Sequence, residues 1–173
     1  MLSLRYFGDP ILRKRAKAIE KVDEETRQIV AEMAKVMKQQ RGIGLAAPQV
    51  GLSIRLFISR IDKETNEGEI IPGELLVFIN PRLSEPSIQE DVMKEGCLSI
   101  PGIREEVWRP EEITVEALDI NGEPFKKRFS GLQARCIMHE NDHLNGALFI
   151  DRITIRARTR IEQPLRAIKK KYK

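Results

Sequence analysis

The chain has 173 residues, of which 41% are hydrophobic and 32% are charged, and its formal net charge is +4. This composition excludes a disordered segment, and no apolar run approaches the roughly 20 residues that a membrane-spanning helix needs. The length is that of one domain, so we predict a single domain over residues 1–173, with a basic C-terminal helix or tail at 155–173.

The positive charge is concentrated at the C-terminus. Residues 156–173 contain eight Lys or Arg and one acid, a local charge of +7, which leaves −3 for the rest of the chain. We therefore expect no sequence-specific nucleic-acid binding by the body of the protein. The first residues have neither the long apolar core of a signal peptide nor an Arg- and Ser-rich transit composition, and two cysteines are too few for a disulfide framework. A cytoplasmic protein with no membrane partner is expected.

The first predicted element is an amphipathic helix. Asp23 and the two glutamates after it are typical of a helix start. Apolar residues recur from Ile29 to Met37 at positions i, i+1, i+4, i+7 and i+8, and Gly42 is a natural end of the helix. The small residues at 42–49 that follow predict a loop.

Strands are expected in the middle of the chain. Two short ones are predicted at 54–60 and 75–80, and the polar, Gly- and Pro-containing stretch 61–74 between them predicts a long surface loop. Farther on, residues 113–120 alternate between apolar and polar, and Asn121-Gly122 predicts a type I′ hairpin with a return strand at 125–129.

Two helices are predicted in the C-terminal part. Ser130 and Gln133 have the spacing of a capping box, and the helix that they begin is expected to stop at Asn145-Gly146. It is apolar on much of its circumference, so it should be central and buried. A final helix is expected to begin or break at Pro164. One narrow apolar stripe is predicted along it, at Ile161, Leu165, Ile168 and Tyr172.

Both histidines of the chain lie in the segment His139-Glu140-Asn141-Asp142-His143, which fits H-E-x-x-H. On a helix, positions i and i+4 differ by about 40° in azimuth and about 6 Å in rise, so the two imidazoles can converge on one metal ion. Glu140 is then close enough to polarise a water bound there. The alternative is a pair of buried, hydrogen-bonded histidines.

A catalytic metal site needs a third protein ligand, and the chain has no third histidine. Cys136 lies about 10 Å before His143 along the helix, a span that metal–ligand bonds of about 2.1–2.3 Å do not bridge, so we expect it to be a pocket or core residue. Cys97 is the better candidate, with a small buried hydrophobe as its alternative. Glu162 has a spacing that resembles thermolysin-like zinc peptidases, but it lies among arginines with which it is expected to pair.

Three segments together resemble, in order, the signature motifs of peptide deformylase: Gly42–Gln49 (GIGLAAPQ), Glu95–Ser99 (EGCLS) and His139–His143 (HENDH). The similarity extends to Gly8–Arg13, Ile79–Pro81 and Leu144–Gly146, and it covers nearly the whole chain except the tail and the 61–74 stretch. Met138 departs from the pattern, because a glutamine is common before the first histidine. This departure concerns the surroundings of the ligands and does not alter the assignment.

The resemblance implies an α+β fold, in which antiparallel β-sheets surround a central metal-binding helix that carries H-E-x-x-H, with a C-terminal helix. It implies Cys97, His139 and His143 as the metal ligands. It also implies Fe²⁺ as the ion in the cell, although the same ligand types suit Zn²⁺, Ni²⁺ or Co²⁺.

The implied reaction is the hydrolytic removal of the formyl group from the N-terminal formyl-methionine of nascent polypeptides, with release of formate. In this reaction Glu140 accepts the proton of the attacking water and returns it to the leaving amine. The side-chain amide of Gln49 and the backbone N–H of Leu98 are expected to stabilise the negative charge on the formyl oxygen.

The resemblance also implies how the substrate binds. Gly44 and its neighbours allow a peptide to add as a strand, and the methionine side chain needs an apolar pocket. The expected pocket residues are Ile43, Met93, Leu132 and Cys136. Glu95 is expected to orient the Cys97 loop, and Arg109 matches an arginine near the substrate groove, although each has a structural salt bridge as its alternative.

The basic tail is expected to hold the enzyme near the ribosome, whose surface is mostly RNA phosphate. Two other functions stay open from the residues alone: a peptidase that uses Glu162 as its third ligand, and a zinc-stabilised interaction domain whose metal is closed and inert.

Overall fold

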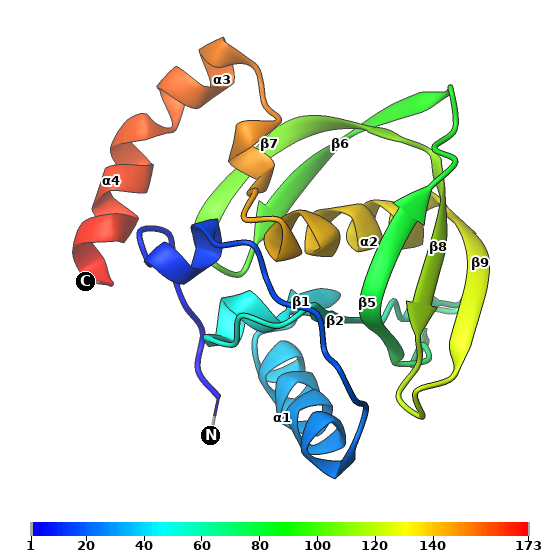
Figure 1. The fold of residues 1–173 in the computed structure, drawn as a ribbon. Helices are drawn as coiled ribbons and strands as arrows, with labels where there is room; N and C mark the ends of the chain where they lie inside the picture. The colour runs from blue at the N-terminus through cyan, green and yellow to red at the C-terminus, as the bar shows by residue number, and fades with distance from the viewer. Residues whose placement is uncertain (1, 173) are drawn as a thin grey trace.

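The computed structural model describes residues 2–172, which contain four α-helices, nine strands and three short 3₁₀ helices (Figure 1). The α-helices are α1 (Glu24–Gln39), α2 (Gly131–Leu144), α3 (Ile155–Arg160) and α4 (Glu162–Lys171). The 3₁₀ helices are η1 (Pro10–Arg13), η2 (Ala47–Val50) and η3 (Phe149–Asp151). The strands are β1 (Gly44–Ala46), β2 (Leu56–Ser59), β3 (Lys63–Glu64), β4 (Ile70–Ile71), β5 (Leu76–Ser84), β6 (Glu90–Cys97), β7 (Ile100–Pro110), β8 (Glu112–Leu118) and β9 (Pro124–Ser130).

Antiparallel sheets surround the central helix α2. The main sheet has the strand order β1-β2-β5-β8-β9, and β6 and β7 form a separate long ribbon. Figure 1 shows α2 between this ribbon and the main sheet, with α1 packed under β1 and β2 and with α3 and α4 on the far side of β7. The predicted α+β fold with a central helix is therefore confirmed.

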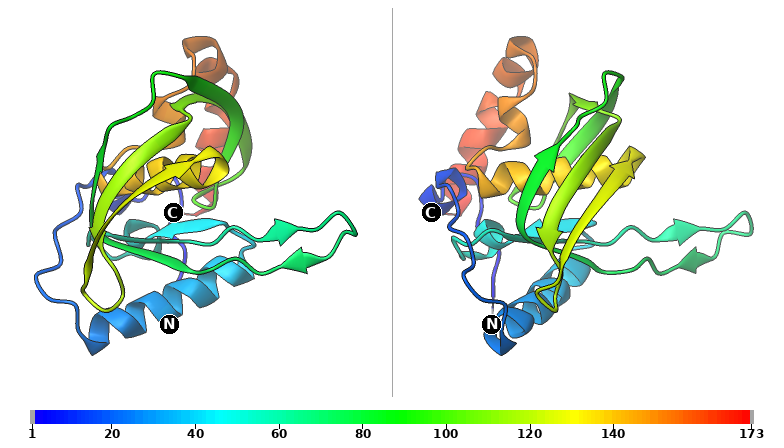
Figure 2. Two further views of the ribbon diagram at one scale, coloured as in Figure 1. Left: turned by 90° about the vertical axis from the view of Figure 1, so that its right-hand side faces the viewer. Right: turned by 45° about the vertical axis from the view of Figure 1, so that its right-hand side comes forward.

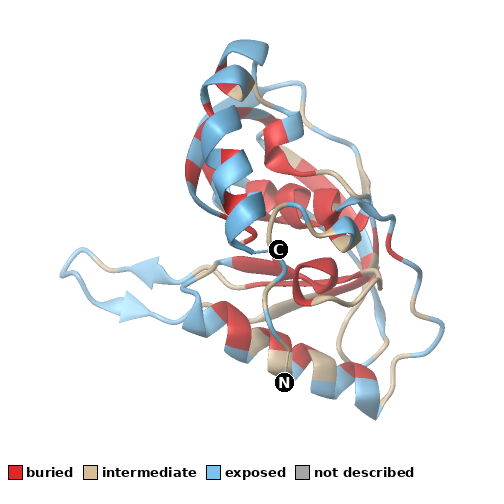
Figure 3. Ribbon diagram, turned by 90° about the vertical axis from the view of Figure 1, so that its left-hand side faces the viewer, coloured by how far each residue is buried: buried red, intermediate tan, exposed pale blue. Residues whose placement is uncertain are grey.

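The central helix α2 is buried along most of its length, as its apolar circumference predicts (Figure 3). Ile137 and Leu144 pack in one core cluster with Phe57 of β2 and Phe78 of β5, whose rings stack with centroids 4.6 Å apart. This packing holds α2 rigidly against the main sheet and leaves its opposite side facing the β6–β7 ribbon.

Helix α1 begins as predicted, because the Asp23 side chain accepts the backbone N–H of Thr26 at 3.1 Å. Its end differs from the prediction. The residue with left-handed backbone is Arg41, with φ of 54°, and not Gly42. The reason for glycine at 42 is packing, since a Cβ there would lie 2.8 Å from Cδ1 of Leu98.

Two segments predicted as loops contain regular structure. Residues 42–49 form the edge strand β1 and the 3₁₀ helix η2, because Gly44 to Ala46 pair with β2 in the antiparallel register Gly44↔Ser59. Residues 61–74 form the two-stranded hairpin β3–β4, which projects from the body of the molecule (Figure 2). Both loop predictions missed strands of only two or three residues, which are too short to show a local pattern, and the partner of β1 lies in a different segment.

The hairpin between β8 and β9 is confirmed, but its predicted turn type is wrong. Gly122 has a positive φ of 81° and Asn121 does not, whereas a type I′ turn needs both. The Asp119 carboxylate accepts the backbone N–H groups of Asn121 at 2.8 Å and Glu123 at 2.9 Å. This side chain therefore sets the turn.

The predicted capping box at the start of α2 is absent, although the helix is present at the expected place. Ser130 does not cap the helix through its side chain. Gln133 instead donates its Nε2 amide to Ser59 Oγ on β2 at 2.8 Å. The long-range hydrogen bond to the main sheet therefore replaces the local one.

The β6–β7 ribbon was not predicted from sequence. Along β6 the single buried residue is Glu95, so the strand lacks the apolar alternation that identifies a half-buried strand. Its eight-position pairing with β7 holds it in place. This ribbon carries Cys97 to α2 and is therefore the element on which the site depends.

The C-terminal helix packs through the apolar stripe that its sequence predicts. Ile161, Leu165 and Ile168 are buried in a cluster with residues of β7, and Tyr172 stacks on Tyr6 with ring centroids 3.7 Å apart. Pro164 lies in the first turn of α4, where a missing N–H is tolerated. Within residues 2–172, no helix has the length and hydropathy that a membrane crossing requires.

Candidate metal centre

One side chain from the ribbon and two from α2 converge beside the helix. The ligand atoms of Cys97, His139 and His143 all lie within 4.8 Å of one another, and this is the one such group among residues 2–172. Cys97 Sγ is 3.3 Å from His143 Nε2, and the two imidazole rings have centroids 5.2 Å apart. The convergence expected from the i and i+4 spacing is therefore present.

Cys97 lies where the pairing of the ribbon changes. The register of β6 with β7 shifts between Gly96, which faces Arg104, and Cys97, which faces Ile100. The shift leaves residues 101–103 of β7 without a partner on β6, close to the turn between the two strands. The thiol points to the histidines from the very end of β6, immediately before the turn that contains Leu98.

Glu95 orients the first histidine. Its Oε2 lies 2.9 Å from His139 Nδ1, so a proton on Nδ1 leaves Nε2 free to bind a metal. Arg109 donates to both Glu95 oxygens, at 2.6 and 2.9 Å, and Arg135 donates to Oε1 at 2.8 Å. Burial alone raises the pKa of Glu95, but the hydrogen bonds from Arg109 and His139 outweigh it and hold that pKa well below its ordinary value.

His143 is suited to metal binding by its burial. Its side chain is almost completely enclosed, and this desolvation lowers its pKa well below the ordinary value for histidine. A neutral imidazole is the form that binds a metal. Together with a Cys sulfur and a second imidazole, it makes a donor set of the kind that divalent transition metals take, so the residues present fit a metal ion.

Glu140 is a buried carboxylate next to this cluster. It is 4% exposed, and its Oε2 accepts no hydrogen bond from any residue in the described range. Burial raises its pKa to about 7, close to the value that a general acid or base needs at neutral pH. The carboxylate has room only because residue 44 is glycine, since a Cβ there would collide with Glu140 and with Cys136 Sγ.

Gln49 reaches the cluster from η2. Its Oε1 accepts the Ala46 N–H at 2.8 Å, and this contact orients the amide. Its Nε2 lies 3.4 Å from Cys97 Sγ and 3.3 Å from Ser99 Oγ. Ser99, which is fully buried, is a contact that the sequence analysis did not single out, although it stands in the motif with Cys97.

Three large apolar side chains expected in the methionine pocket are partly open to solvent. Ile43, Met93 and Leu132 are 42%, 40% and 43% exposed, values that a core residue does not have. Cys136 is buried one helical turn after Leu132, and its Sγ lies 3.6 Å from the Ile43 carbonyl oxygen. Burial raises the pKa of the Cys136 thiol, and this cysteine is not among the three residues whose donor atoms converge.

Arg109 does not lie on an open groove. Its side chain is 3% exposed and its third contact is Asp142, at 3.0 Å, so the structural salt bridge is the alternative that describes its position. Glu162 pairs with Arg166 on the exposed side of α4 and is not part of the cluster. Two further residues complete the ion pairs around Glu95: Arg135 pairs with Glu95 itself, and Asp142 pairs with Arg109. Of these two, only Asp142 lies in a sequence motif, H-E-x-x-H, that could have drawn attention to it.

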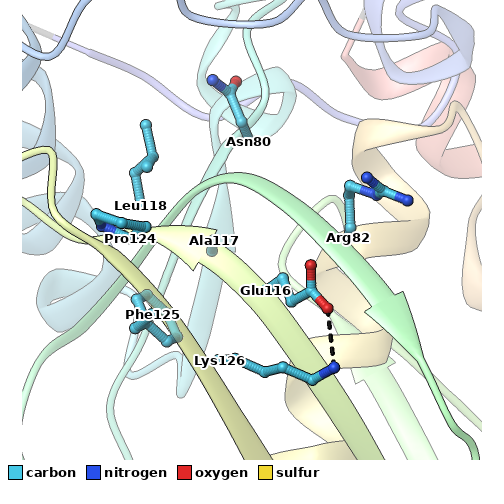
Figure 4. A pocket seen from close by; sticks show the side chains of 8 residues that line it. All are labelled: Asn80, Arg82, Glu116, Ala117, Leu118, Pro124, Phe125 and Lys126. Atoms are coloured by element: carbon cyan, nitrogen blue, oxygen red, sulfur yellow. Dashed lines mark ion pairs between the residues drawn. The ribbon is translucent and has the colours of Figure 1, made fainter.

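Two open hollows of the surface lie away from the cluster. One of about 670 Å³ is on the main sheet, where Phe125 and Leu118 lie beside the ion pair of Glu116 and Lys126 (Figure 4). Another, of about 290 Å³, is lined by Asp91, Arg135 and the start of α2. Neither is lined by a residue of the Cys97 cluster, so we assign the chemistry from the converging side chains.

A cysteine, two histidines and a buried carboxylate brought together in an α+β fold fit a metal-dependent hydrolase. Comparison with known proteins agrees with this class. The chain belongs to the polypeptide deformylase family, whose model matches residues 1–159. It is accordingly an enzyme that removes N-terminal formyl groups from nascent polypeptides.

Relatives and solved structures match most of the chain. It is 46% identical over 152 residues to peptide deformylase 1 of Nostoc sp.. This aligned region covers 88% of this chain and 79% of the relative. The peptide deformylase of Plasmodium falciparum matches with a TM-score of 0.89 at 35% identity, over 98% of this chain and 96% of that one. The Synechococcus elongatus enzyme, solved in complex with actinonin, matches with a TM-score of 0.81 at 39% identity, over 99% and 85%.

Proposed function

We propose that Cys97, His139 and His143 hold the catalytic metal ion and that Glu140 is the general base. The observation that carries this proposal is the convergence of three donor atoms within 4.8 Å beside a buried carboxylate. A metal ion bound there supplies a Lewis acid that acidifies water and stabilises negative charge. We propose Fe²⁺ as the ion in the cell, as the family resemblance implies, with Zn²⁺, Ni²⁺ and Co²⁺ fitting the same donors.

The chain's own residues move the proton and stabilise the charge. Glu140 takes up the proton that the attacking water loses and delivers it to the departing amine, and its pKa of about 7 suits both steps. The Nε2 amide of Gln49 and the backbone N–H of Leu98 donate to the formyl oxygen, where negative charge develops. One such donor is worth about 3 kcal/mol.

The peptide adds as a strand at the β1 edge of the main sheet. β1 is the edge strand, and the pairing of an extended chain with backbone groups there is independent of side chains. The partly exposed Ile43, Met93 and Leu132 then enclose the methionine side chain, with Cys136 behind them. An enzyme that meets many different nascent chains needs this combination of general backbone contacts and one specific pocket.

The ligand set is tested by metal content. We expect Cys97→Ala to lose most of its bound metal, whereas Cys136→Ala and Glu162→Ala keep it, because neither control residue belongs to the cluster. Elemental analysis of the purified variants measures this directly. Full metal occupancy in Cys97→Ala would exclude the proposed ligands.

The base is tested separately. Glu140→Gln should bind metal and yet release formate from formyl-Met-Ala at least about 100-fold more slowly, because an amide cannot transfer the proton. Near-normal turnover by this variant would remove Glu140 from the mechanism.

We also propose that the reaction takes place in the cytoplasm, at the ribosome, with the basic tail as the contact. The apolar stripe of α4 is docked on β7, while Lys169, Lys170 and Lys171 are exposed at its end. Contacts of lysine with RNA phosphate release counterions, so binding should weaken steeply with salt.

Ribosome binding is tested with a triple variant. Alanine at 169, 170 and 171 should reduce co-sedimentation with ribosomes at low salt while turnover of formyl-Met-Ala is kept. A control triple variant at Lys35, Lys38 and Lys63, which are exposed on α1 and β3, should sediment like the unaltered protein. Unchanged co-sedimentation of the tail variant would rule the contact out.

A further inference from the structure

Arg152 lies outside the three motifs, directly after η3, and its side chain is 46% exposed. Its Nε and Nη2 donate to the two carboxylate oxygens of Asp142, at 2.6 and 2.5 Å. A bidentate contact of this kind fixes both the position and the rotation of a carboxylate. Asp142 is therefore held from its solvent side by a residue that no step of the reaction uses.

Asp142 depends on this contact. Its side chain is 8% exposed, and two of the three hydrogen bonds that it accepts from described side chains come from Arg152, the third coming from Arg109 Nη1 at 3.0 Å. A buried carboxylate that loses partners must turn toward solvent or draw its remaining partner closer. Either movement changes the position of Arg109.

Arg109 passes such a movement on to the histidine. Its guanidinium is planar and rigid, and the same group that contacts Asp142 through Nη1 contacts Glu95 through Nε and Nη2. Glu95 in turn accepts from His139 Nδ1. A rotation at the Asp142 end therefore displaces the carboxylate that sets the ring of His139.

We propose that Arg152 is a positioning residue, which sets the orientation of His139 through this chain of buried ion pairs. The inference rests on the proposed function, because the ring orientation matters only if His139 binds metal. Loss of a direct partner of a metal-binding histidine costs about 10–100-fold in metal affinity. Arg152 acts through intermediates, so about 5–10-fold is expected.

The experiment uses Co²⁺ as the probe. The dissociation constant of Co²⁺ is measured by competition with a chelator, together with the visible absorption of the cobalt–thiolate group and kcat and KM for formyl-Met-Ala. Arg152→Ala should bind Co²⁺ about 5–10-fold more weakly, shift the absorption bands and lower kcat at unchanged KM. Arg152→Lys should fall between, because an ammonium cannot make the bidentate contact.

Arg160 provides a matched control. It is also a partly exposed arginine from the C-terminal part that contacts both oxygens of a buried carboxylate, that of Glu105 on β7, at 3.3 and 2.7 Å. Glu105 faces Glu95 across the β6–β7 ribbon, but among the described residues its carboxylate makes its hydrogen bonds and ion pair with Arg160 and none with Glu95, Arg109 or Arg135. Arg160→Ala should therefore lower the melting temperature as Arg152→Ala does, with Co²⁺ affinity and spectrum unchanged.

The outcomes separate the inference from the proposed site. If the unaltered protein binds Co²⁺ with a thiolate absorption band and Arg152→Ala binds it within twofold as tightly, or if both arginine variants weaken it equally, Arg152 has no positioning role. If the unaltered protein shows no thiolate band, the proposed ligand set fails and this inference fails with it. Should Arg152→Ala not fold, Arg152→Lys decides by the same measurements.

Discussion

Gly44 is the position at which the smallest change should have the largest effect on the site. Gly44→Ala adds one methyl group to the edge strand β1, inside the protein, where the new Cβ would lie 2.6 Å from Cys136 Sγ and 2.9 Å from Glu140 Cδ. One carboxylate oxygen of Glu140 is approached more closely still. Ordinary contact begins at 3.4 Å, so these side chains must move by roughly 0.8 Å.

The expected cost follows from the packing around them. Cys136 and Glu140 are both buried on α2, which lies between the main sheet and the ribbon, so a displacement of either side chain disturbs its packing. Overpacking of this kind costs about 1–3 kcal/mol, or about 2–12 °C in melting temperature for a chain of this size. A misplacement of about 1 Å in a catalytic group can cost about 100-fold in rate. We expect kcat to fall by about that factor.

Two further variants sharpen the assay, which combines formate release with thermal unfolding. Gly96→Ala makes the same chemical change beside Cys97, but its nearest contact is the flexible Arg104 side chain at 3.3 Å, so turnover should stay within about threefold of the unaltered protein. Cys136→Ala in the Gly44→Ala background removes the sulfur contact. It should return part of the melting temperature and little of the activity, because the contact with Glu140 remains.

The reasoning is refuted if Gly44→Ala turns over formyl-Met-Ala at a rate close to that of the unaltered protein. It is also refuted if the activity returns with Cys136→Ala, because the displaced group would then be the sulfur and not the carboxylate.

Other predictions concern acid stability, the metal and the projecting hairpin. Burial opposes ionisation of Asp151, but hydrogen bonds from Arg13 and from the Leu148 N–H hold its pKa below the ordinary value. This stabilisation is present above the unfolded pKa of about 3.9 and is lost as the pH falls through the lower folded value. Asp151→Asn should therefore lower the melting temperature at pH 7 by a few degrees at most and have less effect near pH 3; an equal loss at both pH values would contradict this. If the ion is Fe²⁺, activity should decay in air and return on reloading with Ni²⁺ or Co²⁺, whereas an air-stable preparation that holds only iron would argue against it. Replacing the β3–β4 hairpin by a short turn should change KM for peptide substrates more than kcat, and no change for any peptide would remove the hairpin from substrate binding.

Several elements could be predicted from sequence because their signals are local. The capping residue Asp23 and the apolar period of α1, the apolar circumference of α2 and the stripe of α4 each depend on residues within a few turns of one another. Local signals are weaker where side chains compete. At the β8–β9 turn, hydrogen bonds to the Asp119 carboxylate set a different turn from the predicted type I′. At the start of α2, the hydrogen bond from Gln133 to Ser59 takes the place of the predicted capping box.

The type of chemistry was also determined by the sequence, because H-E-x-x-H places two imidazoles on one helical face wherever the helix lies. For the third group the residues favoured Cys97 and the family resemblance implied it, but only the tertiary structure shows how its thiol comes to lie beside the imidazoles. Cys97 is 42 residues before His139, on a ribbon without an apolar pattern, and the long-range pairing of β6 with β7 holds it in place. The ion pairs from Glu95 to Arg152 likewise join residues far apart in the chain. A local pattern records neighbours along a segment, whereas a site assembled from several segments depends on the packing that brings those segments together.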